Sequence, residues 1–267
     1  MQRTVTDQLG NKITINYPPT RIISIVPSQT ELLFELGLGK EVVGVTKFCI
    51  HPIEKFATRT KVGGTKKLNI ELIRSLKPDL IIGNKEENQQ DQIEELANEF
   101  PVWMSDISTL DDAKAMIAGI GALVNREPEA AYLNFLITAG FADLQTLALQ
   151  NNINMRVAYL IWRNPFMAAG TSTFINDLLA INGLTNVINQ TRYPEIDLQH
   201  LKSLNPELIL LSSEPYPFSP VHFSELQSAL PEAKVMLVDG EMFSWYGSRL
   251  VKAVQYLFEF QKEISVK

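Results

Sequence analysis

The sequence is poor in the residues that form disulfides and most metal sites. It has one cysteine, Cys49, which excludes an internal disulfide and any metal site built on several thiolates. Its three histidines, His51, His200 and His222, are far apart, and no two of them stand at the spacing of a metal-binding pair. We therefore predict no resident metal ion, and a site at which the three histidines converge is the weaker hypothesis.

Basic charge and long apolar runs are also scarce. Lys and Arg number 24 against 30 Asp and Glu, for a formal net charge of -6. Nucleic acids and anionic membranes attract basic patches, so neither is predicted as the main partner. No apolar run approaches the ~18 residues of a membrane-spanning helix. The first twenty residues lack the features of a secretory signal, which leaves the compartment open between the cytoplasm and an extracytoplasmic location.

The motifs of common enzymes are missing as well. No Gly-x-Ser-x-Gly surrounds any serine, and Ser28 has no histidine or acid at a suggestive spacing. There is no P-loop, and no Gly-x-Gly-x-x-Gly follows the first predicted strand, which disfavours nucleotide binding. We predict a protein that holds a ligand and is not an enzyme.

One long helix is predicted over Asn125–Gln150. Pro128 falls in its first turn, where proline is tolerated, and Ile137 and Phe141 belong to an apolar stripe with three- and four-residue spacing. Gly140 lies near that stripe and weakens the helix slightly. At helical rise the segment would reach about 30 Å, roughly the width of a small domain.

The chain on the two sides of this helix repeats one pattern. Ile70–Ile82 (IELIRSLKPDLII) matches Leu198–Leu210 (LQHLKSLNPELIL), and Val102–Asp106 matches Val235–Asp239. A helix, a proline and a strand are common in α/β proteins, but the same order on both sides of one unmatched helix indicates an internal repeat. The helix is then expected to be the only element that crosses between the halves.

Alternating strands and helices predict an α/β fold with two Rossmann-like lobes and mainly parallel sheets. The predicted limits are residues 1–124 for the N-terminal lobe, 125–150 for the connecting helix and 151–267 for the C-terminal lobe. A β-hairpin precedes the first sheet. Pro27–Gln29, Arg163–Gly170 and Phe243–Gly247 are predicted as loops or turns.

Ligands bind at the carboxyl ends of strands in open α/β sheets, so the candidate residues lie in the loops that follow predicted strands, in a cleft between the lobes. In the first lobe they are Pro27, Ser28, Gln29, Phe48, His51, Thr65, Lys66, Asn84 and Lys85. In the second they are Trp162, Arg163, Phe166, Met167, Arg192, Tyr193, Glu214, Tyr216, Trp245, Tyr246 and Arg249. The aromatic residues suit a large, flat ligand, and the arginines suit its carboxylate or phosphate groups.

Several of these residues have a plainer interpretation. Trp162 fits equally well as the last buried residue of its strand, and His51 before a proline is more typical of a turn. The lysines are typical of solvated surface. Trp245 and Tyr246 stand beside a glycine in a predicted loop, where burial as core is awkward, so we expect them to contact ligand.

The chain resembles a known family in several motifs spread along its length. They are Asp7-Gln8-Leu9-Gly10, Pro18-Pro19-x-Arg21-Ile22-Ile23-Ser24, Pro27-Ser28-Gln29-Thr30-Glu31-Leu32, Lys61-Val62-Gly63-Gly64 and Leu76-Lys77-Pro78-Asp79-Leu80-Ile81-Ile82. The family is that of the helical-backbone substrate-binding proteins of ABC importers, which take up cobalamin, iron-siderophores and haem. The resemblance covers essentially the whole chain and is closest to the cobalamin-binding branch.

The resemblance implies a monomer that holds a metal-bearing organic ligand, a corrinoid, a ferric siderophore or haem, with no covalently bound cofactor. It implies corrin contacts at the turn that begins with Pro27, at Phe48, near Phe166 and at Tyr193. It also implies docking onto an ABC permease through one surface position on each lobe, which are Glu71 and Gln199 here.

Two other functions stay open. The first is a cytoplasmic corrinoid- or metal-handling protein, either an enzyme or a metallochaperone, with His51 or Glu214 as metal ligands. The second is a structural or partner-binding role in which the cleft stays empty.

Overall fold

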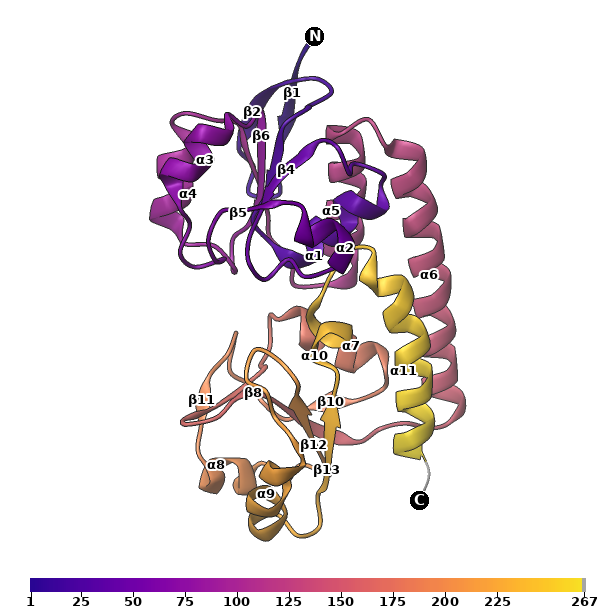
Figure 1. The fold of residues 1–267 in the computed structure, drawn as a ribbon. Coiled ribbons are helices and arrows are strands. Elements are labelled where there is room, and N and C mark those ends of the chain that lie inside the picture. The colour runs from indigo at the N-terminus through magenta and orange to yellow at the C-terminus, as the bar shows by residue number, and fades with distance from the viewer. Residues whose placement is uncertain (266–267) are drawn as a thin grey trace. The chain divides into compact units, whose positions relative to one another are not determined.

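The computed structural model of the protein describes residues 1–265, which form two compact units (Figure 1). The first unit contains Met1–Ile107, Asp111–Leu136 and Tyr246–Arg249, and the second contains Ser108–Leu110, Ile137–Trp245 and residues 250–265. Within residues 1–265, no helix combines the length and apolar character needed to cross a membrane.

A five-stranded parallel sheet forms the centre of the first unit, in the order β5-β4-β3-β6-β7. Its strands are β3 (Ile22–Ser24), β4 (Val42–Val45), β5 (Thr60–Lys61), β6 (Leu80–Asn84) and β7 (Val102–Ser105). The strand order reverses between β3 and β6. Such a switch point is where doubly wound sheets bind ligands, at the carboxyl ends of the strands.

Helices cover both faces of this sheet. They are α1 (Pro27–Glu35), α2 (Ile53–Ala57), α3 (Ile70–Leu76), α4 (Gln90–Ala97) and α5 (Leu110–Leu123). Figure 1 shows α3 and α4 on one face, with α1 and α5 on the other. Ile73 of α3 and Leu96 of α4 pack on Ile23 and Ile81 of the sheet, all of them buried. Apolar side chains on both faces explain why these strands are continuous apolar runs in the sequence.

The predicted hairpin is confirmed. Strands β1 (Gln2–Thr6) and β2 (Lys12–Asn16) pair antiparallel, with Val5 opposite Ile13. The buried carboxylate of Asp7 holds the turn by accepting from the backbone N–H of Asn11 at 2.7 Å. Gly10 supplies the positive φ of 85° that this turn needs.

The second unit has a six-stranded mixed sheet, in the order β11-β9-β8-β12-β13, with β10 also paired to β8. Its strands are β8 (Arg156–Trp162), β9 (Phe166–Ala168), β10 (Thr185–Asn186), β11 (Glu195–Ile196), β12 (Leu208–Ser212) and β13 (Lys234–Val238). The prediction of a plain loop over Arg163–Gly170 is wrong, because a tight turn at Asn164 (φ 64°) sends β9 back antiparallel along β8.

Helices also cover both faces of the second sheet. They are α7 (Phe174–Ile181), α8 (Leu198–Ser203), α9 (Phe223–Ala229), α10 (Gly240–Ser244) and α11 (Arg249–Ser265), and a short 3-10 helix η1 (Pro220–His222) precedes α9. Leu201 of α8 and Leu226 of α9 pack on Leu211 of β12. Tyr159 of β8 packs against Phe243 of α10, with ring centroids 5.3 Å apart.

The internal repeat is visible in the topology. In the first unit β3 pairs with β6 and β6 with β7, and in the second β8 pairs with β12 and β12 with β13, all parallel. The matched segments Ile70–Ile82 and Leu198–Leu210 each supply a helix and the next strand, α3 with β6 and α8 with β12.

The predicted long helix is confirmed as α6 (Glu127–Gln150), which begins two residues late because Asn125 has a positive φ of 59°. In the second unit α6 and α11 lie side by side (Figure 1). A Cβ on Gly140 would lie 2.7 Å from Cγ2 of Val254. Gly140 therefore lies where α6 and α11 pack closely together, and it does not break α6.

The expectation that this helix is the only element crossing between the halves is wrong. Tyr246–Arg249 belongs to the first unit, although the chain on both sides of it belongs to the second. The reason is local: Gly247 lies against the backbone of Ser28, and Arg249 is bonded to Glu31 of α1. The lobe limits at residues 124 and 150 stay a prediction.

Candidate functional site

The predicted ligand residues differ widely in exposure. The exposed ones are Phe48, Lys66, Lys85 and Trp162. The half-buried ones are His51, Thr65, Arg163, Phe166, Met167, Arg192, Tyr193, Glu214 and Tyr216. The buried ones are Pro27, Ser28, Gln29, Asn84, Trp245, Tyr246 and Arg249. Ligand contact by each of them stays a prediction, and the exposed and half-buried groups are accessible without rearrangement.

Pro27–Gln29 is the first turn of α1, so the prediction of a separate turn there is wrong. Proline at the start of a helix lacks only an N–H that the helix would leave unbonded. The Gln29 amide donates to Oγ of Ser105, which also accepts from the Asn84 amide at 3.0 Å. This buried polar cluster joins the carboxyl ends of β6 and β7 to α1 and orders the edge at which the sheet switches direction.

An exposed apolar surface follows β4 in the first unit. Phe48 is 50% exposed, and a Cβ on Gly64 would lie 3.1 Å from its ring. Ile50 and Ile53 are 40% and 65% exposed, and the N–H of Ile50 donates to the carbonyl of Phe48 in a tight turn. Neither isoleucine was predicted as a candidate from the sequence. The available signal was two β-branched apolar residues flanking His51-Pro52 in a loop after a strand.

The lysine candidates bond to nearby oxygen atoms. Nζ of Lys85 lies 2.6 Å from the carboxylate of Asp106, just after β7. Nζ of Lys66 donates to the backbone carbonyl of Glu86 at 2.6 Å. Both side chains are exposed, as the solvated-surface interpretation predicts.

Aromatic side chains gather at the carboxyl ends of β8 and β12 in the second unit. We name Trp162, Tyr216, Phe218 and His222 the aromatic cluster. Trp162, 40% exposed, lies edge-on to Tyr216 with ring centroids 5.6 Å apart. The ring centroids of Tyr216 and Phe218 lie 4.7 Å apart, and the hydroxyl of Tyr216 lies 3.3 Å from Nε2 of His222. The position between two adjacent parallel strand ends matches the switch point of the first sheet.

Two of the three candidate arginines are neutralised within their own unit. Arg163 donates to Glu225 of α9, at 2.9 Å from Nε and 2.8 Å from Nη2. Arg249 binds Glu31 through two parallel bonds of 2.8 and 2.9 Å, and only 5% and 8% of the two side chains are exposed. Arg192 is half-buried in a backbone conformation with φ 63°.

The expectation that Trp245 and Tyr246 resist burial is wrong. They are 8% and 6% exposed. The indole N–H of Trp245 donates to Oε1 of Glu214 at 2.8 Å, and the hydroxyl of Tyr246 donates to Glu87 at 3.2 Å. Buried tryptophan and tyrosine need a partner for the polar tip, and carboxylates distant in the sequence supply one here.

Burial raises the pKa of Glu214, while hydrogen bonds from Ser244 and Trp245 oppose that rise only in part, and the charges of Glu241 and Asp239 add to it. The folded protein therefore binds a proton at Glu214 more readily than the unfolded chain does. The stability gained from this proton is full below the ordinary carboxyl pKa and is lost as pH rises through the raised one.

We expect Glu214→Gln to be more stable than the parent at pH 7 and equally stable near pH 4. The amide oxygen can still accept from Trp245 and Ser244, and no buried charge remains at neutral pH. Thermal melting at both pH values tests this, with the exposed Glu232→Gln as the matched control. A lower melting temperature for Glu214→Gln at pH 7 would show that the ionised carboxylate is the stabilising form.

Within residues 1–265, no three His, Cys, Asp or Glu side chains come together as ligands. Cys49 is buried, its sulfur lies 3.1 Å from the hydroxyls of both Thr30 and Thr46, and burial raises the pKa of its thiol to about 11. A protonated, covered thiol is a poor nucleophile and a poor metal ligand.

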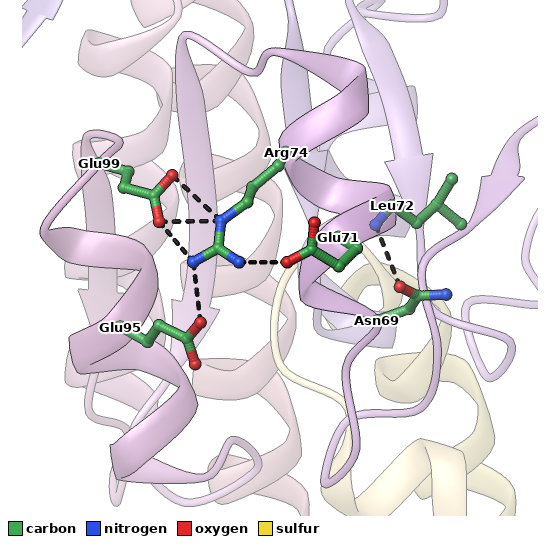
Figure 2. A network of polar contacts seen from close by, with 6 residues as sticks. All are labelled: Asn69, Glu71, Leu72, Arg74, Glu95 and Glu99. Carbon is green, nitrogen blue, oxygen red and sulfur yellow. Dashed lines mark hydrogen bonds and ion pairs between the residues drawn. The ribbon is translucent and has the colours of Figure 1, made fainter.

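The two predicted docking positions lie on corresponding helices. Glu71 is in the first turn of α3. The side chain of Asn69 caps this helix by accepting a hydrogen bond from the backbone N–H of Leu72 (Figure 2). Gln199 is exposed in the first turn of α8, which Asp197 caps by accepting from the N–H of His200.

Comparison with known proteins identifies the family. Residues 22–232 match the periplasmic binding protein family, so the chain belongs to that family. A vitamin B12-binding protein of Pectobacterium carotovorum is 28% identical over 251 residues, covering 90% of this chain and 87% of its own. An uncharacterized ABC transporter substrate-binding lipoprotein of Bacillus subtilis is 27% identical over 268 residues, covering 96% and 84%.

Solved structures have the same fold. The periplasmic vitamin B12 binding protein BtuF of Vibrio cholerae superposes with a TM-score of 0.80 at 22% identity, covering 94% of this chain and 99% of its own. The haem-binding protein RhuT of Roseiflexus sp. RS-1 gives 0.81 at 20% identity, covering 92% and 98%. The two-lobed α/β prediction is confirmed, and the matched family is that of the periplasmic binding proteins.

Proposed function

We propose that this protein is a non-enzymatic carrier of a corrinoid for an ABC importer. In the first unit Phe48, Ile50 and Ile53 are exposed and available for ligand contact, and in the second unit Trp162 and Tyr216 of the aromatic cluster are accessible. Exposed aromatic and aliphatic side chains bind the faces and edges of a large flat ring through apolar contact. The curated relatives named as vitamin B12-binding proteins support this choice.

The ion pairs of two of the three candidate arginines support this choice of ligand class. Haem has carboxylate side chains, whereas a corrinoid has mainly carboxamides. A buried carboxylate needs a cation, and Arg163 and Arg249 are already bonded to carboxylates of their own units. A ligand rich in carboxamides places no such demand. Haem is the alternative, favoured by the haem-binding structures that share the fold.

A ligand panel tests the proposal. Tryptophan emission is followed while the protein is titrated with cyanocobalamin, dicyanocobinamide, haemin and a ferric siderophore, with free tryptophan amide correcting for ligand absorbance. We expect both corrinoids to bind at least tenfold more tightly than haemin or the siderophore, about 1.4 kcal/mol. Tighter binding of haemin would replace the corrinoid assignment with haem, and no binding by any member would end both.

The same assay tests the contact residues. Phe48→Ala and Trp162→Ala should each weaken corrinoid binding by about tenfold, because each removes an aromatic anchor. Tyr132→Ala is the matched control, since Tyr132 is an aromatic residue on α6 that is 62% exposed and outside the proposed contacts. Equal losses in all three variants would contradict the assignment.

We further propose that Glu71 docks on a permease, and that the position of Gln199 contributes no charge. Glu71 is 82% exposed at the surface of the first unit. An exposed carboxylate can pair with a guanidinium of a partner protein.

A further inference from the structure

Arg74 is surrounded by three carboxylates of the first unit (Figure 2). Its Nη1 donates to Glu71 at 2.5 Å, its Nη2 donates to Glu95 at 2.8 Å, and Glu99 accepts from both Nε and Nη2. The bonds join α3 to α4, and the four side chains together keep an excess of two negative charges. Hydrogen bonds from Arg74 lower the pKa of Glu99.

The three carboxylates are not held equally. Glu71 is 82% exposed and accepts one bond from the guanidinium, whereas Glu95 and Glu99 are 49% and 40% exposed and Glu99 is bound through two nitrogen atoms. An exposed ion pair contributes about 0–1 kcal/mol. Glu71 can therefore leave Arg74 at small cost, and Arg74 would still be paired with Glu95 of α4 and with Glu99, which follows that helix.

The internal repeat places this arrangement in one unit only. Arg74 corresponds to Lys202, and Glu71 corresponds to Gln199. A lysine has no planar fork of donors that could hold several carboxylates at once, and a glutamine offers no charge to exchange. At these corresponding positions the first unit carries a carboxylate and a guanidinium that competes for it, and the second unit carries neither.

We propose that Arg74 is an internal competitor for the docking carboxylate. On docking, a guanidinium of the permease would replace Arg74 at Glu71 while Arg74 stays bonded to Glu95 and Glu99. Arg74 then sets how tightly the carrier docks. This inference rests on the proposed docking role of Glu71.

Three variants test the exchange, with binding measured against the cobalamin-class ABC permease of the source organism in lipid nanodiscs. Arg74→Gln should tighten docking about two- to fivefold, the factor that corresponds to losing one exposed pair. Glu99→Gln should weaken docking by a similar factor, because Arg74 then bonds more strongly to Glu71. Glu94→Gln makes the same charge change on α4 at a residue bonded to Gln90, and should have no effect.

The outcomes separate the two proposals. Weaker or unchanged docking of Arg74→Gln, or equal effects of Glu94→Gln and Glu99→Gln, would overturn the competition even if Glu71→Gln abolishes docking. Unchanged docking of Glu71→Gln would overturn the docking role itself, and the competition with it. In the Glu71→Gln background, Arg74→Gln should no longer tighten docking. Thermal melting of each variant checks that the first unit stays folded.

Discussion

Replacing Arg249 with alanine should destabilise the first unit by about 3–5 kcal/mol, because it removes the guanidinium that is paired with the buried carboxylate of Glu31. Only 5% of the Arg249 side chain and 8% of the Glu31 side chain are exposed, and two parallel bonds join them. Urea unfolding gives the overall loss. Hydrogen exchange of α1 peptides shows where it occurs, since α1 carries Glu31.

Two further variants test whether the buried charge causes this loss of stability. Glu31→Leu combined with Arg249→Met removes both charges and should recover most of the stability. Lys262→Ala breaks the exposed pair with Glu259 on the same helix α11 and should cost under about 1 kcal/mol. If the double variant is as unstable as Arg249→Ala, the buried charge of Glu31 does not cause the loss of stability. The loss would then come from the contacts that the Arg249 side chain makes.

Gly140→Leu should destabilise the second unit by about 3 kcal/mol, at the upper end of the usual cost of overpacking. A Cβ at this position already lies 2.7 and 2.8 Å from the two methyl groups of Val254, and a leucine would force α6 and α11 apart. The change would otherwise favour α6, since leucine is a better helix former than glycine by roughly 0.5–1 kcal/mol.

The neighbouring residue provides the control. Ala139 is exposed on α6, so Ala139→Leu should change the free energy of unfolding by less than about 0.5 kcal/mol. Both variants are compared by urea unfolding with circular dichroism. A stabilised Gly140→Leu would mean that α11 does not pack tightly on Gly140.

The sequence predicted those parts of the fold that depend on local pattern. The hairpin, α3 and α8 with their following strands, and α6 are each set by periodicity and by caps such as Asn69 and Asp197. The strand β9 was missed because three residues carry too little periodicity, and its place depends on pairing with β8. Local pattern is sufficient for regular elements and insufficient for short edge strands.

The candidate site was harder to predict, because burial of polar side chains depends on distant partners. Arg249 meets Glu31 across 218 positions and Tyr246 meets Glu87 across 159. No local signal pairs such residues, so a loop assignment suggested exposure where the structure shows burial. Phe48 and Trp162 are exposed near strand ends, so the interpretation of Trp162 as a buried strand residue is wrong, while ligand contact by either stays a prediction.

The central claim, that the chain is a corrinoid carrier, is tested most directly by calorimetric titration of the purified protein with cyanocobalamin. We expect one site per chain and a Kd of about 1 μM or tighter, which corresponds to roughly 8 kcal/mol of binding free energy. Haemin titrated under the same conditions should bind at least tenfold more weakly. Absence of saturable cyanocobalamin binding together with tight, stoichiometric binding of haemin would show that the ligand is haem and not a corrinoid.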